Sequence, residues 1–232
     1  MVLKFHVPIL EYHRVKPYAG ETGYAVSLIV PPETFAAQMK AMAGAGYHTI
    51  TMGELGEDMR TGIQPAPKSF VVTFDDGYED GYTYARPILQ SEGFVATYFV
   101  IGSMIDHPDH LKVAELRSLV ASGNEIGNHT MSHEDLRPYV LKPEKLKSEI
   151  YDASAIIAAD VGVWPRSFCY PAGFTNTWVE AEVAATPGIE TAVIQSGHQP
   201  ETWGNRLEMP RIRVSPALRP ADLVTKADLY LK

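Results

Sequence analysis

The sequence has little cysteine, no excess of positive charge and no long apolar run, and each shortage excludes a class of protein. Its single cysteine, Cys169, cannot close an internal disulfide, so no disulfide framework holds the fold together. No stretch approaches the ~20 apolar residues that a membrane-spanning helix needs. Twenty Lys and Arg face 28 Asp and Glu, which gives a net charge of −8 without a basic stripe. This balance argues against nucleic acid as a partner and for a neutral or basic substrate.

The first residues carry no export signal either. Residues 1–8 lack the long apolar core and the small-residue cleavage site of a signal peptide. Two locations therefore stay open: the cytoplasm, or the cell envelope and exterior if an export signal has been trimmed from the chain.

Short β-branched or aromatic runs alternate with amphipathic segments along the chain. Apolar residues make up 45% of the 232 positions, and no long linker interrupts them, so we expect one domain over residues 1–232. The βα repeat predicts a parallel sheet with helices outside, either closed as a barrel or open as a doubly wound sheet. The expected strands are 7–12, 47–50, 70–74, 96–101, 125–127, 167–170, 192–195 and 211–214; the expected helices begin at 32, 78, 111, 142, 176 and 217. Cys169 falls in a strand and is expected to be a buried core residue.

Two adjacent carboxylates end one of these strands. The apolar run 70–74 stops at Asp75-Asp76-Gly77. Successive strand residues point to opposite faces, so Gly77 would have to turn the chain sharply for both carboxylates to reach the barrel mouth. The alternative is an ordinary turn that caps the next helix.

Two histidines follow another strand. His129 and His133 are four residues apart and come directly after the strand 125–127. On a helical turn, side chains at this spacing share one face and suit a single metal ion, although two solvated surface histidines would give the same pattern. Two His and one Asp with open positions make a site for a hydrolytic metal or for ferrous iron. The second Asp is then free to act as a base.

These motifs in combination resemble the polysaccharide deacetylases, the NodB-like carbohydrate esterase family 4. The resemblance rests on Thr73-Phe74-Asp75-Asp76-Gly77 followed by His129-Thr130-Met131-Ser132-His133, and it extends from residues 8–13 to residues 210–214. It implies a distorted (β/α) barrel of about seven parallel strands. It also implies that Asp76, His129 and His133 hold one divalent metal, usually zinc with Co, Ni, Mn or Fe as alternatives, and that Asp75 is the general base.

A third family motif, Arg-Pro-Pro-Tyr-Gly, is altered in this chain to Cys169-Tyr170-Pro171-Ala172-Gly173. Pro171 and Gly173 fit the motif, and the resemblance implies that this stretch, Tyr170 included, binds the substrate and that the Ala172 N–H serves the oxyanion. The motif's Arg, which would tether the base, is absent. Arg211 and Arg213 share a face of a late strand, and Arg211 is expected to act as the tether unless both are ordinary surface charges.

The acid of the usual family member is the His of a terminal Leu-x-His motif, which this chain lacks. His13 instead closes the first expected strand, as in a subgroup of exopolysaccharide deacetylases whose motif order is permuted. In a closed barrel the first and last strands are neighbours, so His13 is expected to be the general acid, with a simple strand cap as the alternative. His198 is the next candidate, whereas His6, His48, His107 and His110 are expected at the surface.

The resemblance implies a hydrolase that removes N-acetyl groups from a polysaccharide or oligosaccharide containing N-acetylglucosamine. Three other activities stay open: deacylation of another amide or ester, such as a cyclic imide or acetyl-xylan; a ferrous oxygenase; and an inactive carbohydrate-binding domain. Tyr78, Trp178 and Trp203 are candidate sugar-stacking aromatics. The glycan and the oligomeric state are not readable from the sequence.

Overall fold

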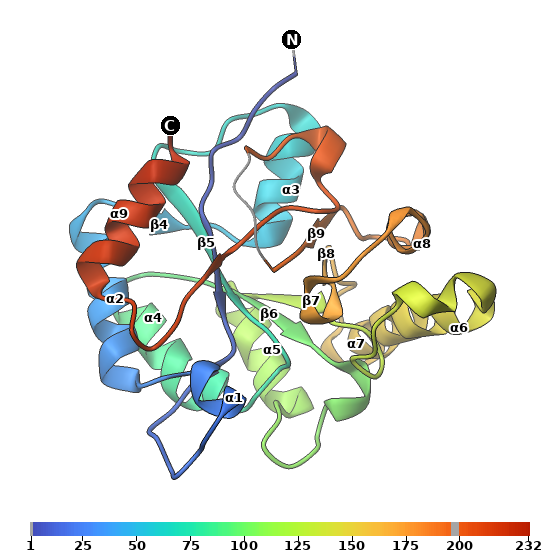
Figure 1. Cartoon of the computed structure of the whole chain (residues 1–232), viewed down its shortest axis with the longest axis horizontal. Helices are drawn as coiled ribbons and strands as arrows, with labels where there is room; N and C mark the ends of the chain where they lie inside the picture. Colours follow the sequence, from blue (N-terminus) through green and yellow to red (C-terminus); the bar gives the residue numbers. More distant parts are fainter. Residues whose placement is uncertain (1, 196–199) are drawn as a thin grey trace.

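The main sheet is a ring of parallel strands, as the computed structural model shows for residues 2–195 and 200–232. Seven strands run in the order β10-β1-β5-β6-β7-β8-β9, and an eighth, β4, pairs with the first residues of β5 (Figure 1). The strands are β1 (Ile9–Tyr12), β4 (His48–Thr49), β5 (Ser69–Phe74), β6 (Thr97–Val100), β7 (Glu125–Asn128), β8 (Ser167–Cys169), β9 (Thr191–Val193) and β10 (Ile212–Arg213). All eight strands predicted from the sequence are confirmed.

The first and last strands of the chain, β1 and β10, are neighbours in the ring. Leu10 and Glu11 of β1 lie opposite Ile212 and Arg213 of β10 in parallel register. On the other side, Val193 of β9 makes only an isolated parallel bridge with Met209, just before β10. One seam is therefore irregular, and the predicted distorted (β/α) barrel is confirmed.

Helices cover the outside of the ring, and α2 packs beside α9 (Figure 1). They are α2 (Pro32–Gly44), α3 (Met52–Thr61), α4 (Arg86–Ser91), α5 (Val113–Ala121), α6 (Pro143–Lys147), α7 (Ala153–Val161), α8 (Thr177–Ala185) and α9 (Pro220–Tyr230); π-helical turns at Gly81–Ala85 and Ser148–Asp152 lead into α4 and join α6 to α7. The sequence prediction omitted α3, although Thr51 and Glu54 form a capping box at its start. It also omitted a small sheet of β2 (Arg14–Val15) and β3 (Ile29–Val30) and the single-turn helix α1 (Tyr24–Ser27).

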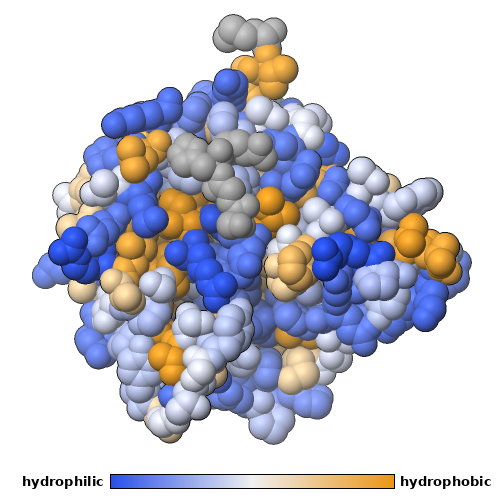
Figure 2. All heavy atoms as spheres, viewed as in Figure 1, coloured by the Kyte–Doolittle hydropathy of each residue, from blue (hydrophilic) through white to orange (hydrophobic). Residues whose placement is uncertain are grey.

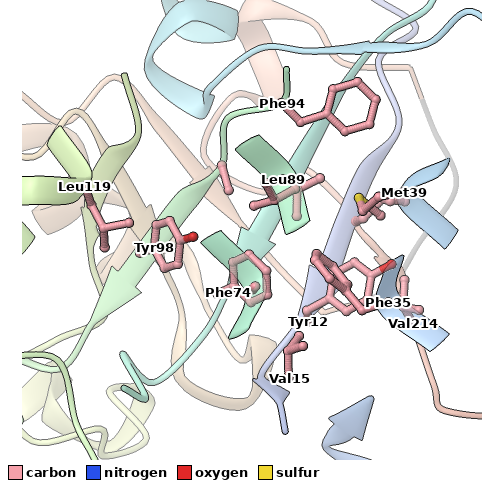
Figure 3. Close-up of a cluster of buried hydrophobic side chains, with 14 of the residues drawn as sticks. Tyr12, Val15, Phe35, Met39, Phe74, Leu89, Phe94, Tyr98, Leu119 and Val214 are labelled. Carbon is pink, nitrogen blue, oxygen red and sulfur yellow. The ribbon is translucent and has the colours of Figure 1, made fainter. Parts of the chain in front are cut away.

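Alternation along β1 and β5 separates the core from the barrel interior. Tyr12 and Phe74 point outward to the helices, where Tyr12 meets Phe35 at 5.1 Å and Phe74 stacks on Tyr98 at 5.0 Å between ring centroids (Figure 3). The intervening residues face inward. Below, the interior is filled by Ile9, Val71, Phe99, Cys169, Val193 and Met209. Cys169 is fully buried in β8, as predicted.

The surface is mainly hydrophilic on the face that Figure 2 draws, with separate small apolar areas among polar ones. Within residues 2–195 and 200–232, no helix combines the length and the apolarity needed to cross a membrane.

Candidate active site

One cavity at the C-terminal ends of the strands holds most of the residues singled out from the sequence. Its volume is about 300 Å³. Location at this end is usual in (β/α) barrels, because the loops that follow the strands meet there. Its walls include the predicted His13, Asp75, Asp76, His129, His133, Ala172, Gly173 and Arg211, together with Tyr24, Leu28 and Gln195, which the sequence did not suggest.

Asp76, His129 and His133 converge on one point of this cavity. The Nε2 atoms of both histidines lie 3.4 Å from Oδ1 of Asp76. The three groups offer ligand atoms that all lie within 4.8 Å of one another. Two imidazole nitrogens and one carboxylate oxygen, with space left toward the cavity, fit a divalent metal that keeps open coordination positions.

The imidazole of His129 is oriented for such a role. It is 2% exposed, and its Nδ1 lies 2.8 Å from the carbonyl oxygen of Cys169. A carbonyl can only accept, so Nδ1 carries a proton, and Nε2 is the ring nitrogen that remains available to a metal. Burial lowers the pKa of His133. The neutral form, which a metal ligand needs, is thereby favoured.

The segment from His129 to His133 is a loop, so the predicted helical turn is wrong. Thr130 and His133 both have left-handed φ angles, 68° and 59°. Asn128 holds the loop because its Oδ1 accepts from the Thr130 N–H at 2.7 Å, while its Nδ2 donates to the Ile150 carbonyl at 2.7 Å. The left-handed residues, rather than helical spacing, turn both imidazoles toward Asp76.

Backbone strain is concentrated at the site. Seven described residues other than glycine have a left-handed φ, and Asp76, Thr130, His133 and Ala172 are four of them. Such conformations cost of order 1–3 kcal/mol each and persist only where surrounding contacts enforce them. At Asp76 the φ of 69° turns its carboxylate to the histidines, while Asp75 continues the inward face of β5.

Asp75 and Arg211 form a buried bidentate ion pair. Nη1 and Nη2 of Arg211 donate to the two carboxylate oxygens at 2.7 Å each, and both side chains are almost fully buried. Burial would raise the pKa of Asp75, but the adjacent guanidinium holds it well below its usual range. Asp75 is thus ionised, and its carboxylate can accept hydrogen bonds but cannot donate one.

Arg211 occupies the space beside Cys169, where the family motif would have its own arginine. Nη2 of Arg211 lies 3.4 Å from the Cys169 sulfur, Nη1 donates to Oγ1 of Thr73 at 3.0 Å, and Nε donates to the Ile194 carbonyl at 3.1 Å. The small thiol leaves room for a guanidinium from Arg211, the residue just before β10, instead of one from β8.

His13 lies between two carboxylates at the cavity wall. Its Nε2 is 4.0 Å from Oδ2 of Asp75, and its Nδ1 is 4.0 Å from Oε1 of Glu11. The sequence placed His13 at the end of the first strand, and the structure places it one residue after β1. His198, the second candidate for the acid, lies outside the described residues.

Glu11 is the main polar residue that sequence reasoning missed. It is 1% exposed, and neither carboxylate oxygen has a hydrogen-bond partner among the described residues. Its nearest cations are Arg211 at 3.4 Å and Arg213 at 3.8 Å. Burial raises the pKa of Glu11, and Arg211 opposes that rise. A charged residue inside the apolar run Ile9-Leu10-Glu11-Tyr12 was the available signal, because an unpaired buried charge is costly.

The altered third motif is only partly at the cavity. Ala172 and Gly173 line it, and Gly173 is required because a Cβ there would meet the Gln195 backbone nitrogen at 2.5 Å. Tyr170 and Pro171 do not line it, and their predicted role in binding the substrate stays a prediction. Tyr170 is fully buried against Phe168, since alternation along β8 turns it away from the barrel interior.

Other sequence expectations need correction as well. His110 is buried rather than at the surface because its ring packs on Tyr78 at 5.0 Å, and Arg14 covers the same tyrosine at 4.1 Å. The Tyr78 ring therefore already packs against His110 and Arg14, which leaves it less available to stack on a sugar. Trp178 and Trp203 are exposed but do not line the cavity. The expected surface position holds for His107, whereas His6 and His48 are half-buried.

Comparison with known proteins agrees with this arrangement. Residues 62–191 match the polysaccharide deacetylase family. YxkH of Bacillus subtilis, named for the same family, is 31% identical over 212 residues, which are 91% of this chain and 72% of YxkH. The peptidoglycan-N-acetylglucosamine deacetylase of Bacillus cereus is 34% identical over 140 residues, 60% of this chain and 62% of that protein.

A solved structure extends the likeness to nearly the whole chain. The Streptococcus pyogenes deacetylase PplD, in complex with acetate, superposes with a TM-score of 0.86 over 97% of this chain and 98% of PplD. Sequence identity is 24%, so this match is evidence for the fold alone.

Proposed function

The chain belongs to the polysaccharide deacetylase family, and we propose that it removes N-acetyl groups from N-acetylglucosamine units of a polysaccharide or oligosaccharide with the help of one divalent metal ion. The observation that carries this proposal is the cavity itself. It combines the ionised carboxylate of Asp75, which Arg211 holds in place, with three side chains that could bind a metal ion and with the separate imidazole of His13. The B. cereus relative is named for the same N-acetyl sugar.

Asp76, His129 and His133 are the residues that would hold the metal, and zinc is the ion that the family usually binds. A divalent ion bound there would polarise the acetyl carbonyl and ease ionisation of a water molecule. The chain's contribution is to fix the donors: the Cys169 carbonyl orients His129, and the left-handed turn at Asp76 orients the carboxylate.

Proton transfer would fall to two other residues. Asp75 is held as an anion by Arg211, and it would accept a proton from the attacking water. His13, on the other side of Asp75, would donate a proton to the departing sugar nitrogen, because an amine leaves poorly without one. The Ala172 N–H at the cavity wall would stabilise the oxyanion.

A base with its own arginine tether favours hydrolysis over the oxygenase alternative, which has no use for it. An inactive binding domain would not need a buried ion pair beside a metal site. Deacylation of an acetyl-xylan or a cyclic imide uses the same groups and is separated by substrate.

Acetate release tests the proposal. Metal-loaded protein is incubated with N-acetylglucosamine, its dimer and pentamer, acetyl-xylan and a small cyclic imide, and the metal-stripped protein is the control. Hydrolysis of the imide releases no acetate and is followed by the opening of its ring. We expect acetate from the oligomers, faster from the pentamer than from the monomer, because neighbouring sugars orient the reacting unit. Turnover of the imide alone, or equal efficiency on monomer and pentamer, would contradict the assignment.

A further inference from the structure

A second cavity, of about 440 Å³, lies at the same rim of the barrel. Its walls come from the two connections that also supply the active-site cavity: residues 14–19 directly follow His13, and residues 79–84 follow Asp76. Asp109 completes the wall. Even a fully extended chain would separate Asp76 from Asp80 by at most ~14 Å, so the two cavities are near neighbours. In Figure 1 the first connection is the blue segment that leads into α1.

The floor of this second cavity is a fixed ion-pair network. Arg14 donates from Nε to Asp80 at 2.7 Å and from Nη2 to Asp109 at 2.8 Å. The other oxygen of Asp80, a buried residue, accepts from the Val15 N–H at 2.8 Å. The guanidinium also lies over the Tyr78 ring. Because these groups satisfy one another, the floor is preorganised and does not need a ligand to form.

The upper wall presents groups that have no such partners. Tyr18 is 48% exposed and Tyr84 is 38% exposed, and both line the cavity with Glu79 and Thr83. Within the described part of the chain, the side chains of these four residues make no hydrogen bond or ion pair with another residue. Two aromatic rings, a hydroxyl and a carboxylate are therefore available together.

This combination fits a sugar ring. A pyranose offers an apolar C–H face, which an aromatic side chain covers, and a polar hydroxyl edge, which hydroxyl and carboxylate groups bind. The charged wall residues are three acids, Glu79, Asp80 and Asp109, and two bases, Arg14 and Lys16, so the balance is one negative charge. That balance disfavours an anionic ligand and suits a neutral or an amino sugar.

We propose that this cavity is a subsite for a neighbouring sugar unit of the polymer whose N-acetyl group occupies the active-site cavity. The inference rests on the proposed deacetylase function and makes it more specific, since it requires a chain substrate. Sugar bound here would help to orient the reacting unit, so its binding energy would appear as a preference for longer oligomers.

The test removes the two rings with a Tyr18→Ala/Tyr84→Ala double variant. Tyr151→Ala is the control, because Tyr151 is similarly exposed, at 37%, and lines neither cavity. The measured quantity is the ratio of kcat/KM on the N-acetylglucosamine pentamer to kcat/KM on the monomer, because only the monomer leaves the neighbouring subsite empty. We expect this ratio to fall about tenfold in the double variant, which corresponds to ordinary aromatic contacts with one sugar, and to stay at the wild-type value in Tyr151→Ala. An unchanged ratio in the double variant overturns the proposal, whether or not both rates fall.

Binding separates this inference from the proposed function. The pentamer is titrated calorimetrically into metal-free wild-type protein and into the double variant. Weaker binding by the double variant supports the subsite even if the wild-type protein releases no acetate, in which case the proposed function alone has failed. Equal affinity of the two proteins, together with acetate release by the wild type, leaves the deacetylase intact and refutes the subsite.

Discussion

Replacing Arg211 by Met should destabilise the protein more than any comparable change of a surface arginine. The guanidinium makes two 2.7 Å bonds to Asp75 and lies 3.4 Å from Glu11, all in the barrel interior. Without Arg211, both carboxylates keep their burial and lose their closest cation. Removing one partner of a buried ion pair costs about 3–5 kcal/mol, because the remaining charge stays desolvated. For a chain of this size, that loss lowers the melting temperature by roughly 6–20 °C.

The loss of stability in Arg211→Met should become smaller as the pH is lowered. In the wild type the pKa of Asp75 is lowered, so the stability that the ion pair supplies is present above the ordinary carboxyl pKa and is lost as pH falls through the lowered value. In Arg211→Met the burial of Asp75 is no longer opposed by Arg211, so its pKa rises and the carboxyl takes up a proton more readily. The difference between wild type and variant should therefore shrink when pH is lowered from 7 to 5.

Thermal unfolding of metal-free protein at both pH values measures this effect. Arg219→Met is the matched control, because Arg219 bonds Asp222 at 2.7 Å with 79% of its side chain exposed, and the melting temperature should hardly change. Arg211→Met combined with Asp75→Asn should lose less than the sum of the single changes, since the Asp75 charge is removed together with its partner and only Glu11 still loses its closest cation. A melting temperature within 2 °C of the wild type at pH 7, an approximate limit set by ~1 kcal/mol in a chain of this length, would refute the reasoning.

Three further substitutions separate the proposed roles. His133→Ala should lose bound divalent metal, measured by elemental analysis, and full occupancy would remove His133 from the ligand set. Asp75→Asn should keep the metal and lower turnover roughly 10²–10⁴-fold; loss of metal instead would exchange the roles of Asp75 and Asp76. His13→Ala should also keep the metal, and it should impair amide hydrolysis far more than hydrolysis of an activated ester, whose leaving group needs no proton. An equal fall on both substrates would contradict an acid role.

The strands were predictable because apolar runs of the right length and composition are local properties. Parallel strands also place their C-terminal ends on one rim, so a residue that follows a strand, such as His13, Asp75 or His129, could be assigned to that rim from the sequence alone. The direction of Tyr170 was equally local. Counting alternate residues from Cys169 would have turned it outward.

Other features depend on contacts that no local pattern contains. The left-handed φ of Thr130 and His133 follows from the Asn128 side chain and its anchor on the Ile150 carbonyl, which is 22 residues away. Spacing alone suggested a helix, which would have served a metal equally well. The cations near Glu11 are Arg211 and Arg213, about 200 residues along the chain, so the burial of Glu11 could be suspected but its partners could not be named.

The order of the strands in the ring explains how His13, near the start of the chain, can lie beside Asp75 and serve as the proposed general acid. The three adjacent strands β10, β1 and β5 carry Arg211, His13 and Asp75 at or next to their ends. Asp76, His129 and His133, the proposed metal ligands, lie on the other side of Asp75, on the turn after β5 and the loop after β7. The Asp75-Asp76 peptide is therefore the junction between the proposed proton-transfer group and the proposed metal-binding group. Gly77 fixes that junction: its φ is 73°, and an added Cβ would meet Val100 at 3.1 Å. A side chain at Gly77 would consequently disturb both groups at once. A substitution in β10 should affect Asp76, His129 and His133 only through its effect on Asp75.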